Sequence, residues 1–516
     1  MNQRKTGAIL TYLVLFAQNL IAILYTPLML RQLGQSEYGL YSLVISIIGY
    51  LSILDLGFGN SIVRYTAKYR ALKDKKSEYS LNGMFLILYT IIGLITAILG
   101  IFLFFNVNMM FSRSLTSEEL RIAKVLVGIS VLNLSLSFPL SIFGAIINAY
   151  ERFIFSKALT LFRIVLNPCI MIPLLLAGYG SIAMISVIAV LNITGLLVNV
   201  WYCFKKLKIK VYFNYWNSSL LKEISRYSFF IFLTLIVDKI YWSTNQVILG
   251  STKGSVEVAV YSVGATFTAF FISFTSVIGS LQLPRFTKLV TSGVNDKVIS
   301  DEFIKLSRLQ FILGCFIYGG FLYIGKEFID LWAGKGYTNA FYIAIIIMTA
   351  LLFGVTQNSA IAVIQAKKLV KFKSIIQLVI AIVHLGLTIP LSIKYGGIGA
   401  AIATFISFFV GNRIILSIYY HKVAKLDMIE LWKQILRFFP TYVVITIILI
   451  ILNFINIPES VVGIILKGIL YSIIFFGLII KFNMNEYEKN QVLSVLLKLR
   501  QRFKGYKRND YYRKNL

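Results

Sequence analysis

Fourteen apolar runs follow one another along this 516-residue chain, with only short polar segments between them. They lie at about 7–31, 40–64, 81–105, 122–148, 155–177, 180–204, 227–249, 256–284, 303–325, 339–364, 374–393, 397–420, 438–456 and 460–481. A helix needs about 20 mostly apolar residues to cross a bilayer, and each run has roughly that length. No segment between the runs could form a soluble domain. We therefore predict an all-α polytopic membrane protein with about fourteen transmembrane helices.

Composition supports this class. The chain is 58% hydrophobic and 14% charged, whereas soluble domains are about 45–50% apolar and about 25% charged. The formal net charge of +30 would suggest a nucleic-acid partner in a soluble protein, but here the basic residues lie in short loops beside apolar runs. We expect no nucleic-acid partner. Arg4 and Lys5 precede the first run, which has no small-residue cleavage site and is predicted to be a retained helix.

The basic residues alternate from loop to loop. Lys and Arg gather in five alternate loops, at 68–76, 205–226, 285–297, 367–373 and 422–437. The loops between them are poor in Lys and Arg. Cytoplasmic loops carry the excess of positive charge. We therefore predict an even number of helices with both termini in the cytoplasm.

The chain also contains an internal repeat. At an offset of 220 residues, Gly34, Glu37, Tyr41 and Ser42 match Gly254, Glu257, Tyr261 and Ser262, and Gln18-Asn19 matches Asp238-Lys239. A one-residue gap aligns Arg64 with Arg285, and YGSIAM at 179–184 resembles YGGIGA at 395–400. We predict two pseudo-symmetric lobes of six helices, with substrate sites at their interface. The predicted divisions are 1–210, 211–425, 426–482 with two extra helices, and a basic cytoplasmic tail at 483–516.

Three stretches carry a resemblance to a known family. They are LGQSEYGLYSLVISIIGYLSILDLGFGNSIVRYTAKYRA (33–71), AIINAYERF (145–153) and YGGIGAAIAT (395–404). They resemble Wzx-type polysaccharide flippases of the multidrug/oligosaccharidyl-lipid/polysaccharide exporter superfamily. The helix count and the repeat extend this resemblance over the whole length.

The resemblance implies a function. It implies export of an undecaprenyl-pyrophosphate-linked oligosaccharide repeat unit across the bacterial inner membrane, by alternating access driven by an ion gradient of H⁺ or Na⁺. The implied partners are the lipid-linked glycan, the bilayer, and a polysaccharide polymerase or other assembly proteins. No cofactor is implied.

Such a substrate requires positive charge inside the membrane, because its pyrophosphate is anionic. Lys239 lies about 13 residues, or roughly 20 Å, from the predicted cytoplasmic end of its helix, so it is the strongest candidate for a phosphate contact. Arg163 and Arg413 are predicted about 12 Å inside the cytoplasmic ends of their helices, where they line a cavity or extend to the membrane surface. Arg64 and Arg285 lie at cytoplasmic helix ends, where they orient the protein or form a cationic entrance.

Two acids lie inside predicted membrane helices. Asp238 adjoins Lys239 but points about 100° away on a helix, so the two are not expected to pair. On a helix, Asp55 and Arg64, nine residues later, would point to opposite sides and could not pair with each other. The partner of Asp55 must therefore come from another helix or be a cation. Asp55 and Asp238 are therefore candidates for ion coupling or for structural pairing.

Amides are the candidate sugar contacts. Gln18, Asn19, Asn245 and Gln246 lie on the pseudo-equivalent first and seventh helices. We expect no metal site, because the cysteines Cys169, Cys203 and Cys315 have no ligand spacing and the histidines His384 and His421 are far apart.

Three other functions compete with a flippase for lipid-linked glycans. A cation-coupled multidrug antiporter would need an acidic or apolar cavity, whereas intramembrane bases outnumber acids here. A flippase for the peptidoglycan lipid precursor stays open. An enzyme would need catalytic loops of some size, and the outward loop 106–121 offers only Glu118 and Glu119, so no catalytic residue is expected. The basic tail is either a lipid-surface helix or a solvated topology anchor.

Overall fold

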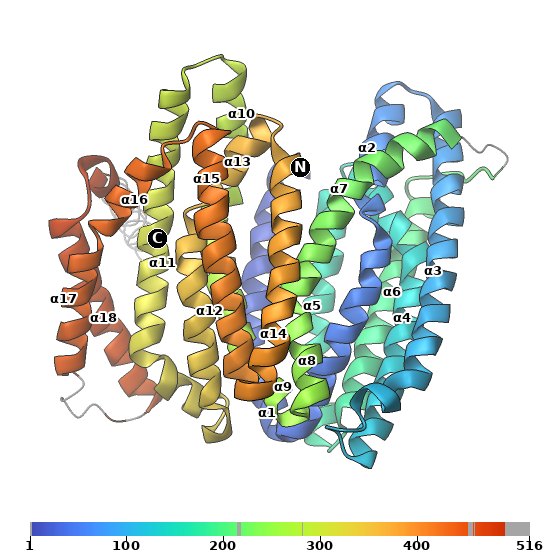
Figure 1. Cartoon of the computed structure of the whole chain (residues 1–516). Coiled ribbons are helices and arrows are strands. Elements are labelled where there is room, and N and C mark those ends of the chain that lie inside the picture. The colour runs from blue at the N-terminus through green and yellow to red at the C-terminus, as the bar shows by residue number, and fades with distance from the viewer. Residues whose placement is uncertain (1–2, 214–217, 281, 453–457, 459, 491–516) are drawn as a thin grey trace, which may run out of the picture. The chain divides into compact units, whose positions relative to one another are not determined.

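The computed structural model describes residues 3–213, 218–280, 282–452, 458 and 460–490, and these form helices without a single strand (Figure 1). Residues 3–205 contain α1 (Gln3–Leu51), η1 (Ser52–Asp55), α2 (Phe58–Ala71), α3 (Lys75–Phe111), α4 (Ser117–Ala149), α5 (Phe153–Leu176) and α6 (Ser181–Lys205). Next come α7 (Ser218–Trp242), α8 (Thr244–Thr252), α9 (Ser255–Ser280), α10 (Leu283–Thr291), α11 (Asp296–Trp332), η2 (Lys335–Tyr337), α12 (Asn339–Val355) and α13 (Asn358–Ala366). The last are α14 (Val370–Ser407), the π-helical η3 (Phe408–Ile415), α15 (Leu416–Lys422), α16 (Met428–Leu436), α17 (Phe439–Leu452) and α18 (Val461–Phe482). Most of the predicted basic tail lies outside the described residues.

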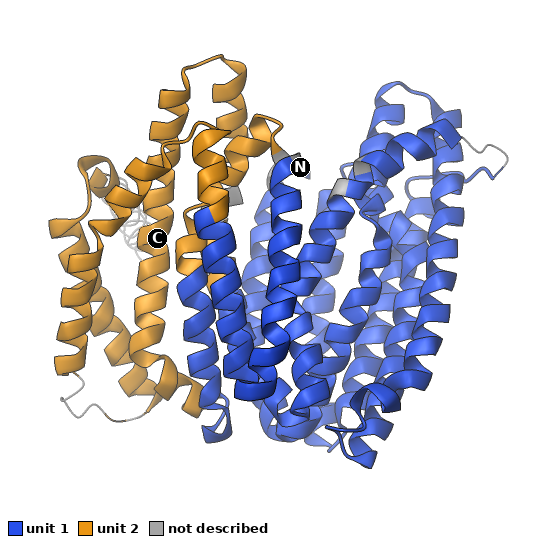
Figure 2. Cartoon of the chain, viewed as in Figure 1, with its two compact units in different colours: residues 1–270, 332–350, 370–414 blue, residues 271–331, 351–369, 415–516 orange. Residues whose placement is uncertain are grey.

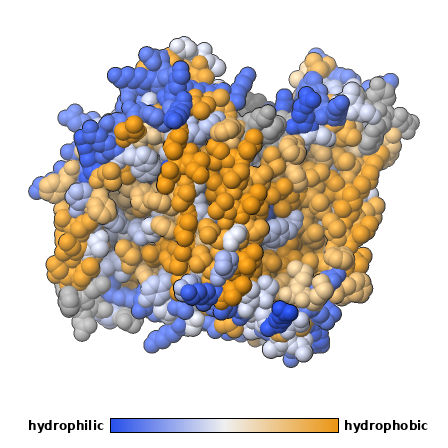
Figure 3. Space-filling model, in the orientation of Figure 1, coloured by the Kyte–Doolittle hydropathy of each residue, from blue (hydrophilic) through white to orange (hydrophobic). Residues whose placement is uncertain are grey.

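The protein is a multi-pass membrane protein. In the described part of the chain, eleven helical segments are long and apolar enough to cross a bilayer. Large apolar side chains such as Phe105 and Leu94 are 72% and 61% exposed, as expected for residues that face lipid. The space-filling view shows apolar side chains along the helices and hydrophilic ones near their ends (Figure 3). Two of the eleven segments contain a glycine with non-helical torsion angles, Gly34 and Gly396. The number fourteen and the location of the termini stay predictions.

The chain divides into two compact units (Figure 2). Unit 1 contains residues 1–270, 332–350 and 370–414, and unit 2 contains residues 271–331, 351–369 and 415–516. Unit 1 holds the first six predicted helices together with α7, α8, η2, all of α14 and most of α9, α12 and η3. The division into lobes at 1–210 and 211–425 rests on the repeat and stays a prediction.

Several membrane helices are broken where the sequence predicts continuous ones. The expected helix at 40–64 ends at Leu51, continues as the short 3₁₀ turn η1 and restarts at Phe58. Leu56 and Gly57 between them have φ angles of 52° and 74°, in the left-handed region that a helix cannot contain. The expected helix at 227–249 is likewise interrupted at Ser243. Hydropathy identifies the crossing but not the break, because the residues at the break are themselves mostly apolar.

The repeated stretches at 34–42 and 254–262, here called the two elbows, make the same contact twice. In the first elbow, Glu37 Oε1 accepts hydrogen bonds from Ser181 N at 2.7 Å and Ser181 Oγ at 2.8 Å, at the start of α6. In the second, Glu257 Oε1 accepts from Gly397 N at 2.6 Å, just after the kink at Gly396. Each carboxylate thus satisfies an orphan N–H group at a helix N-terminus, where the helix dipole favours negative charge.

This contact predicts a stability effect. Glu37→Ala and Glu257→Ala should each destabilise the protein by about 1.5–3 kcal/mol, because a charged hydrogen-bond acceptor is lost. The measurement is thermal unfolding of the purified protein in detergent. Glu118→Ala is the matched control, because its ion pair with Arg121 is exposed (75% and 78%) and should contribute less than about 1 kcal/mol. Equal losses in all three variants would contradict the capping role.

Candidate functional site

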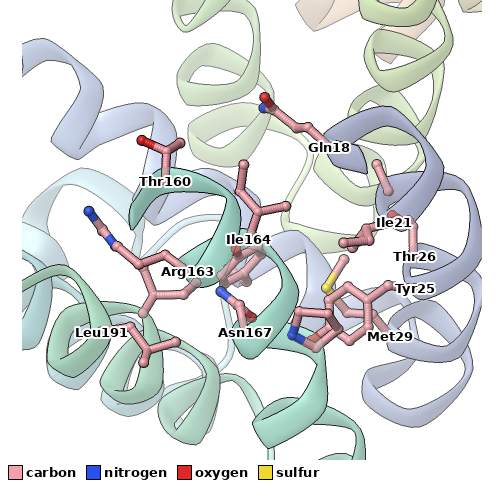
Figure 4. A pocket seen from close by; sticks show the side chains of 14 residues that line it. Gln18, Ile21, Tyr25, Thr26, Met29, Thr160, Arg163, Ile164, Asn167 and Leu191 are labelled. Carbon is pink, nitrogen blue, oxygen red and sulfur yellow. The ribbon is translucent and has the colours of Figure 1, made fainter. Parts of the chain in front are cut away.

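A cavity of about 630 Å³ lies within unit 1, among α1, α5 and α6 (Figure 4). Ligand pockets typically measure about 300–1,000 Å³. Hydroxyl and amide groups alternate with apolar side chains in its wall, and the fourteen lining residues are Gln18, Ile21, Ala22, Tyr25, Thr26, Met29, Tyr41, Thr160, Arg163, Ile164, Asn167, Pro168, Ile188 and Leu191. Arg163 is the one charged residue among these fourteen. The wall therefore combines polar and apolar side chains and carries a single positive charge.

Arg163 is held by an amide network between three helices. Its Nη2 donates to Asn192 Oδ1 at 2.8 Å, and the Asn192 amide donates in turn to Asn133 Oδ1 at 3.0 Å and Ser137 Oγ at 2.7 Å. In Figure 4 the guanidinium points away from Tyr25 and Met29, while the rest of the side chain borders the cavity. No carboxylate pairs with Arg163 in the described part of the chain, so its positive charge is not neutralised by an acid. Because the amide partners are uncharged, they fix the position of the guanidinium without neutralising its charge. That charge can still attract an anion.

Gly195 on α6 leaves the space that Arg163 occupies. A Cβ atom at Gly195 would lie 2.7 Å from Arg163 Cδ and 3.1 Å from its Nη1. Gly195→Val should therefore displace the guanidinium from Asn192 and destabilise the protein by about 1–3 kcal/mol through overpacking. Thermal unfolding measures this. Gly128→Val on α4 is the control, since a Cβ there would meet Phe104 at an ordinary 3.6 Å, and an equal effect of the two would argue against the Arg163 contact.

Lys239 lies between α7 and the second half of α1, and it does not line the cavity. The side chain is half-buried, and a Cβ atom at Gly49 would lie 3.3 Å from its Nζ. The hydroxyl of Ser243 lies equally close to the same point. Asp238 is exposed, and the described part of the chain contains no ion pair between Asp238 and Lys239. The structure therefore places Lys239 and Arg163 in separate surroundings.

Asp55 has a hydrogen-bond partner on another helix, as the phase argument requires. Tyr89 on α3, which is fully buried, donates its hydroxyl to Asp55 Oδ1 at 2.7 Å. A Cβ atom at Gly59 would lie 3.9 and 4.0 Å from the two carboxylate oxygens, so the carboxylate lies over the first turn of α2. Unpaired N–H groups and the helix dipole favour an anion there. The observed contacts are those of a structural acid at a helix break, and an ion-coupling role stays a prediction.

The other three bases have different surroundings. Arg413, in η3, is 5% exposed, and its Nη2 donates to the carbonyl of Ala350 at 3.4 Å. Arg64 is exposed, and its guanidinium lies 5.7 Å from the ring centre of Tyr65. Arg285, in unit 2, forms an ion pair with Glu302 at 2.7 Å. None of the three lines the cavity in unit 1.

The four candidate amides differ in accessibility. Gln18 lines the cavity, whereas the Asn19 amide donates to its own helix at Leu15 O over 2.8 Å. Asn245 is fully buried and donates to Tyr261 Oη and Thr404 Oγ1. Gln246 accepts from Ser46 and donates to Ser262 Oγ at 3.0 Å. Only Gln18 therefore faces the cavity in this conformation, and sugar contacts by the other three stay predictions.

Several cavity residues were missed by reasoning from charge and amides alone. Thr160 and Asn167 accompany Arg163 on α5, and Tyr25 and Thr26 accompany Gln18 on α1. The signal was present, because 160, 163 and 167 have the three- and four-residue spacing of one helix face. The Tyr25 hydroxyl is buried and has no hydrogen-bond partner among the described residues, so it can serve a ligand. In the same part of the chain, no group of three or more His, Cys, Asp or Glu residues is arranged to hold a metal.

Comparison with solved structures identifies the class of fold. The structure matches that of the lipid II flippase MurJ in an inward closed conformation with a TM-score of 0.67 and 16% identity, covering 92% of this chain and 100% of that chain. It matches an inward-facing multidrug resistance MATE family transporter of the MOP superfamily with a TM-score of 0.64 and 13% identity, covering 80% of this chain and 99% of that chain. The chain therefore has the fold of these membrane transporters.

The sequence comparisons identify the family. Residues 5–290 match the model of the polysaccharide biosynthesis protein family, which is more than half of the chain, so the protein belongs to that family. A Shigella flexneri protein named "Putative O-antigen transporter" is 25% identical over 395 residues, covering 74% of this chain and 90% of the relative. The resemblance inferred from the stretch at 33–71 is thus confirmed.

Proposed function

We propose that this protein is a flippase for a lipid-linked oligosaccharide. It would carry an undecaprenyl-pyrophosphate-linked repeat unit from the cytoplasmic to the outer leaflet of the bacterial inner membrane, for the synthesis of a surface polysaccharide. The observation that carries this proposal is the cavity of unit 1, whose fourteen lining residues include hydroxyls, amides and a single charge, that of Arg163. The family and the relative named for O-antigen transport support the same substrate class.

The chemistry of the wall fits the two parts of such a substrate. Sugars present hydroxyl groups, which hydroxyl and amide side chains such as Gln18, Tyr25 and Asn167 can bind without charge. A pyrophosphate needs positive charge, and Arg binds phosphate through two parallel hydrogen bonds. Arg163 supplies that charge in the cavity, and Lys239 supplies a second one near the middle of the membrane. The lipid chain can stay in the bilayer during transfer.

A multidrug antiporter is less well supported by the cavity. A site for cationic drugs would present a carboxylate, and none of the fourteen lining residues is Asp or Glu. A glycan flippase also explains why intramembrane bases outnumber acids. No enzymatic activity is part of the proposal.

The topology that we propose follows the loop charges. Fourteen crossings, arranged as two six-helix lobes and two further helices, would place both termini in the cytoplasm. The basic loops would then attract the anionic lipid substrate to the inner leaflet. Alternating access would be driven by H⁺ or Na⁺, with Asp55 and Asp238 as the acids to test. A polysaccharide polymerase would take up the product.

Translocation by the purified protein tests the proposal directly. Proteoliposomes are loaded with a fluorescently labelled undecaprenyl-pyrophosphate-linked oligosaccharide, and membrane-impermeant dithionite quenches the label in the outer leaflet. The full chain should speed the exposure of inner-leaflet label at least tenfold over empty vesicles. Selective transfer of the peptidoglycan precursor, or selective transport of a lipophilic cation, would identify one of the alternatives and overturn this proposal.

A further inference from the structure

α7 belongs by sequence to the second repeat, yet its first half is bound to helices of the first repeat. It packs against α2 (Figure 1). Three contacts between side chains join the two elements, and we call these contacts the basal seam. Ser61 and Ser228 exchange a hydroxyl hydrogen bond of 2.9 Å, and Tyr65 donates to Glu223 Oε1 at 2.9 Å. A Cβ atom at Gly57 would lie 2.6 Å from Ile231, so the isoleucine fills the notch at the break between α1 and α2.

The serine pair of the basal seam is fully buried, whereas Glu223 is exposed. Ser61 and Ser228 are 0% and 1% exposed, and Ser61 is ten residues, or about 15 Å, from the end of α2. Parting α2 from α7 at the serine pair would leave two buried hydroxyls without partners, which is unfavourable. It would also remove Ile231 from the space beside Gly57, at the break between α1 and α2.

The segment that leads into α7 is bound to the first repeat as well. Tyr212 N donates to Tyr79 O at 3.0 Å, and Asn82 Nδ2 donates to Lys210 O at 3.3 Å. Gly83 leaves room for the carbonyl of Tyr212, which a side chain at that position would displace. The connection from α6 is therefore fixed to α3 as far as residue 212.

The contacts at the elbows differ in kind, and we call them the elbow seam. Glu119 Oε1 accepts from both Ser36 and Ser255, whose hydroxyls are 3.3 Å apart. Gly39 lies directly against the carbonyl of Ser255. Ser36 and Glu119 are half-buried and only Ser255 is buried, at 4% exposed, so water can reach two of the three partners when these hydrogen bonds break. Breaks in the helices, at 52–57 and at Ser243, separate the two seams.

The polar pairs of the basal seam are absent from the matching positions of the repeat. At the same offsets, Ala8 takes the place of Ser228 and Phe286 that of Tyr65. The hydroxyl pair and the tyrosine–glutamate pair are therefore specific to one edge of the transporter. A general folding requirement of the repeat would have produced them twice.

We propose that the first half of α7 moves as one body with the first six helices, so that the basal seam stays closed throughout transport while the elbow seam opens. The inference rests on the proposed flippase function and adds to it: the lipid-linked glycan does not pass between α2 and α7. The opening that admits it must lie along another edge.

Two cysteine pairs test the two seams with opposite expectations. In a Cys169→Ser background, which removes the exposed native thiol, the basal pair is Ser61→Cys with Ser228→Cys, and the elbow pair is Ser36→Cys with Ser255→Cys. Hydroxyl separations of 2.9 and 3.3 Å show that the side chains of both pairs meet, as a disulfide requires. Maleimide labelling after denaturation measures the disulfide yield, and dithionite quenching in proteoliposomes measures translocation.

The oxidised basal pair should translocate lipid-linked glycan within twofold of its reduced form. The oxidised elbow pair should lose at least tenfold and recover with dithiothreitol. A basal disulfide that stops translocation reversibly would overturn the proposal, as would an elbow disulfide that leaves it unchanged.

A second measurement does not depend on substrate. Spin labels at Lys68→Cys on α2 and Lys222→Cys on α7, two exposed positions beside the basal seam, report the distance between these helices. One narrow distance distribution, unchanged by labelled glycan or by an imposed ion gradient, is expected, and a second population would overturn the proposal. If the unmodified chain fails to translocate glycan, the proposed function fails, whereas the distances still decide whether the seam opens.

Discussion

Lys239→Ala should lower translocation of lipid-linked glycan by about 10- to 100-fold, the largest effect we expect from a single substitution. A charged hydrogen bond contributes about 1.5–3 kcal/mol, which corresponds to this range. The ammonium lies beside Gly49 and is half-buried, and the sequence predicts it inside a membrane helix, where a cation is costly and persists mainly for function. The measurement is dithionite quenching in proteoliposomes, together with surface polysaccharide in cells that depend on this protein.

Two companion variants separate charge from packing. Lys239→Arg keeps the positive charge and should retain more activity than alanine, although the larger guanidinium has little room beside Gly49. Lys239→Met keeps the aliphatic stem and loses the charge, so it should behave like alanine. Normal translocation by the alanine variant at wild-type protein levels would remove Lys239 from the mechanism.

Tyr89→Phe should destabilise the protein by about 1.5–3 kcal/mol, the second large effect. It removes the hydroxyl that donates to Asp55 at 2.7 Å and leaves a half-buried carboxylate with one partner fewer. Asp55→Asn should be destabilising too, because the neutral amide interacts less favourably with the first turn of α2. Thermal unfolding in detergent measures both, and unchanged stability in both variants would refute the structural role.

The same variants test whether Asp55 also couples transport to an ion. Tyr89→Phe keeps the carboxylate, so translocation per folded molecule should still respond to an imposed H⁺ or Na⁺ gradient. If Asp55→Asn retains that response, the acid serves only the helix break. If Asp55→Asn alone loses it, the carboxylate carries the coupling as well, and Tyr89 is its positioning residue.

Reasoning from the residues succeeded where the signal is local to the chain. Hydropathy identified the membrane class, because burial in lipid imposes about 20 apolar residues on each crossing. The stretch at 33–71 identified the family, and the correspondence of Glu37 with Glu257 reappears as two equivalent helix caps. Asp55 and Arg64 would point to opposite sides of one helix, so the partner of Asp55 had to come from another element. Tyr89 is such a partner.

The candidate site was recovered only in part. Arg163 and Gln18 face the cavity, whereas Asn245 is fully buried in hydrogen bonds to other helices. The sequence lists charged and amide residues, but it does not tell which of them face one another. Thr160 and Tyr25 escaped notice because hydroxyl residues are common in membrane helices and carry no distinctive charge.

The sequence by itself determined a helical, multi-pass membrane protein of the polysaccharide biosynthesis family, built with a repeated elbow. Hydropathy, helical phase and motif spacing are properties of residues near one another in the chain, so they can be read without a structure. Only the tertiary structure decided that the helix after the elbow breaks at 52–57, that Arg163 is held by Asn192, and that α7 is bound to α2. Those outcomes depend on packing between residues that are 29 to 167 positions apart in the chain. Contacts between such distant residues produce no periodic pattern in the sequence from which they could be predicted.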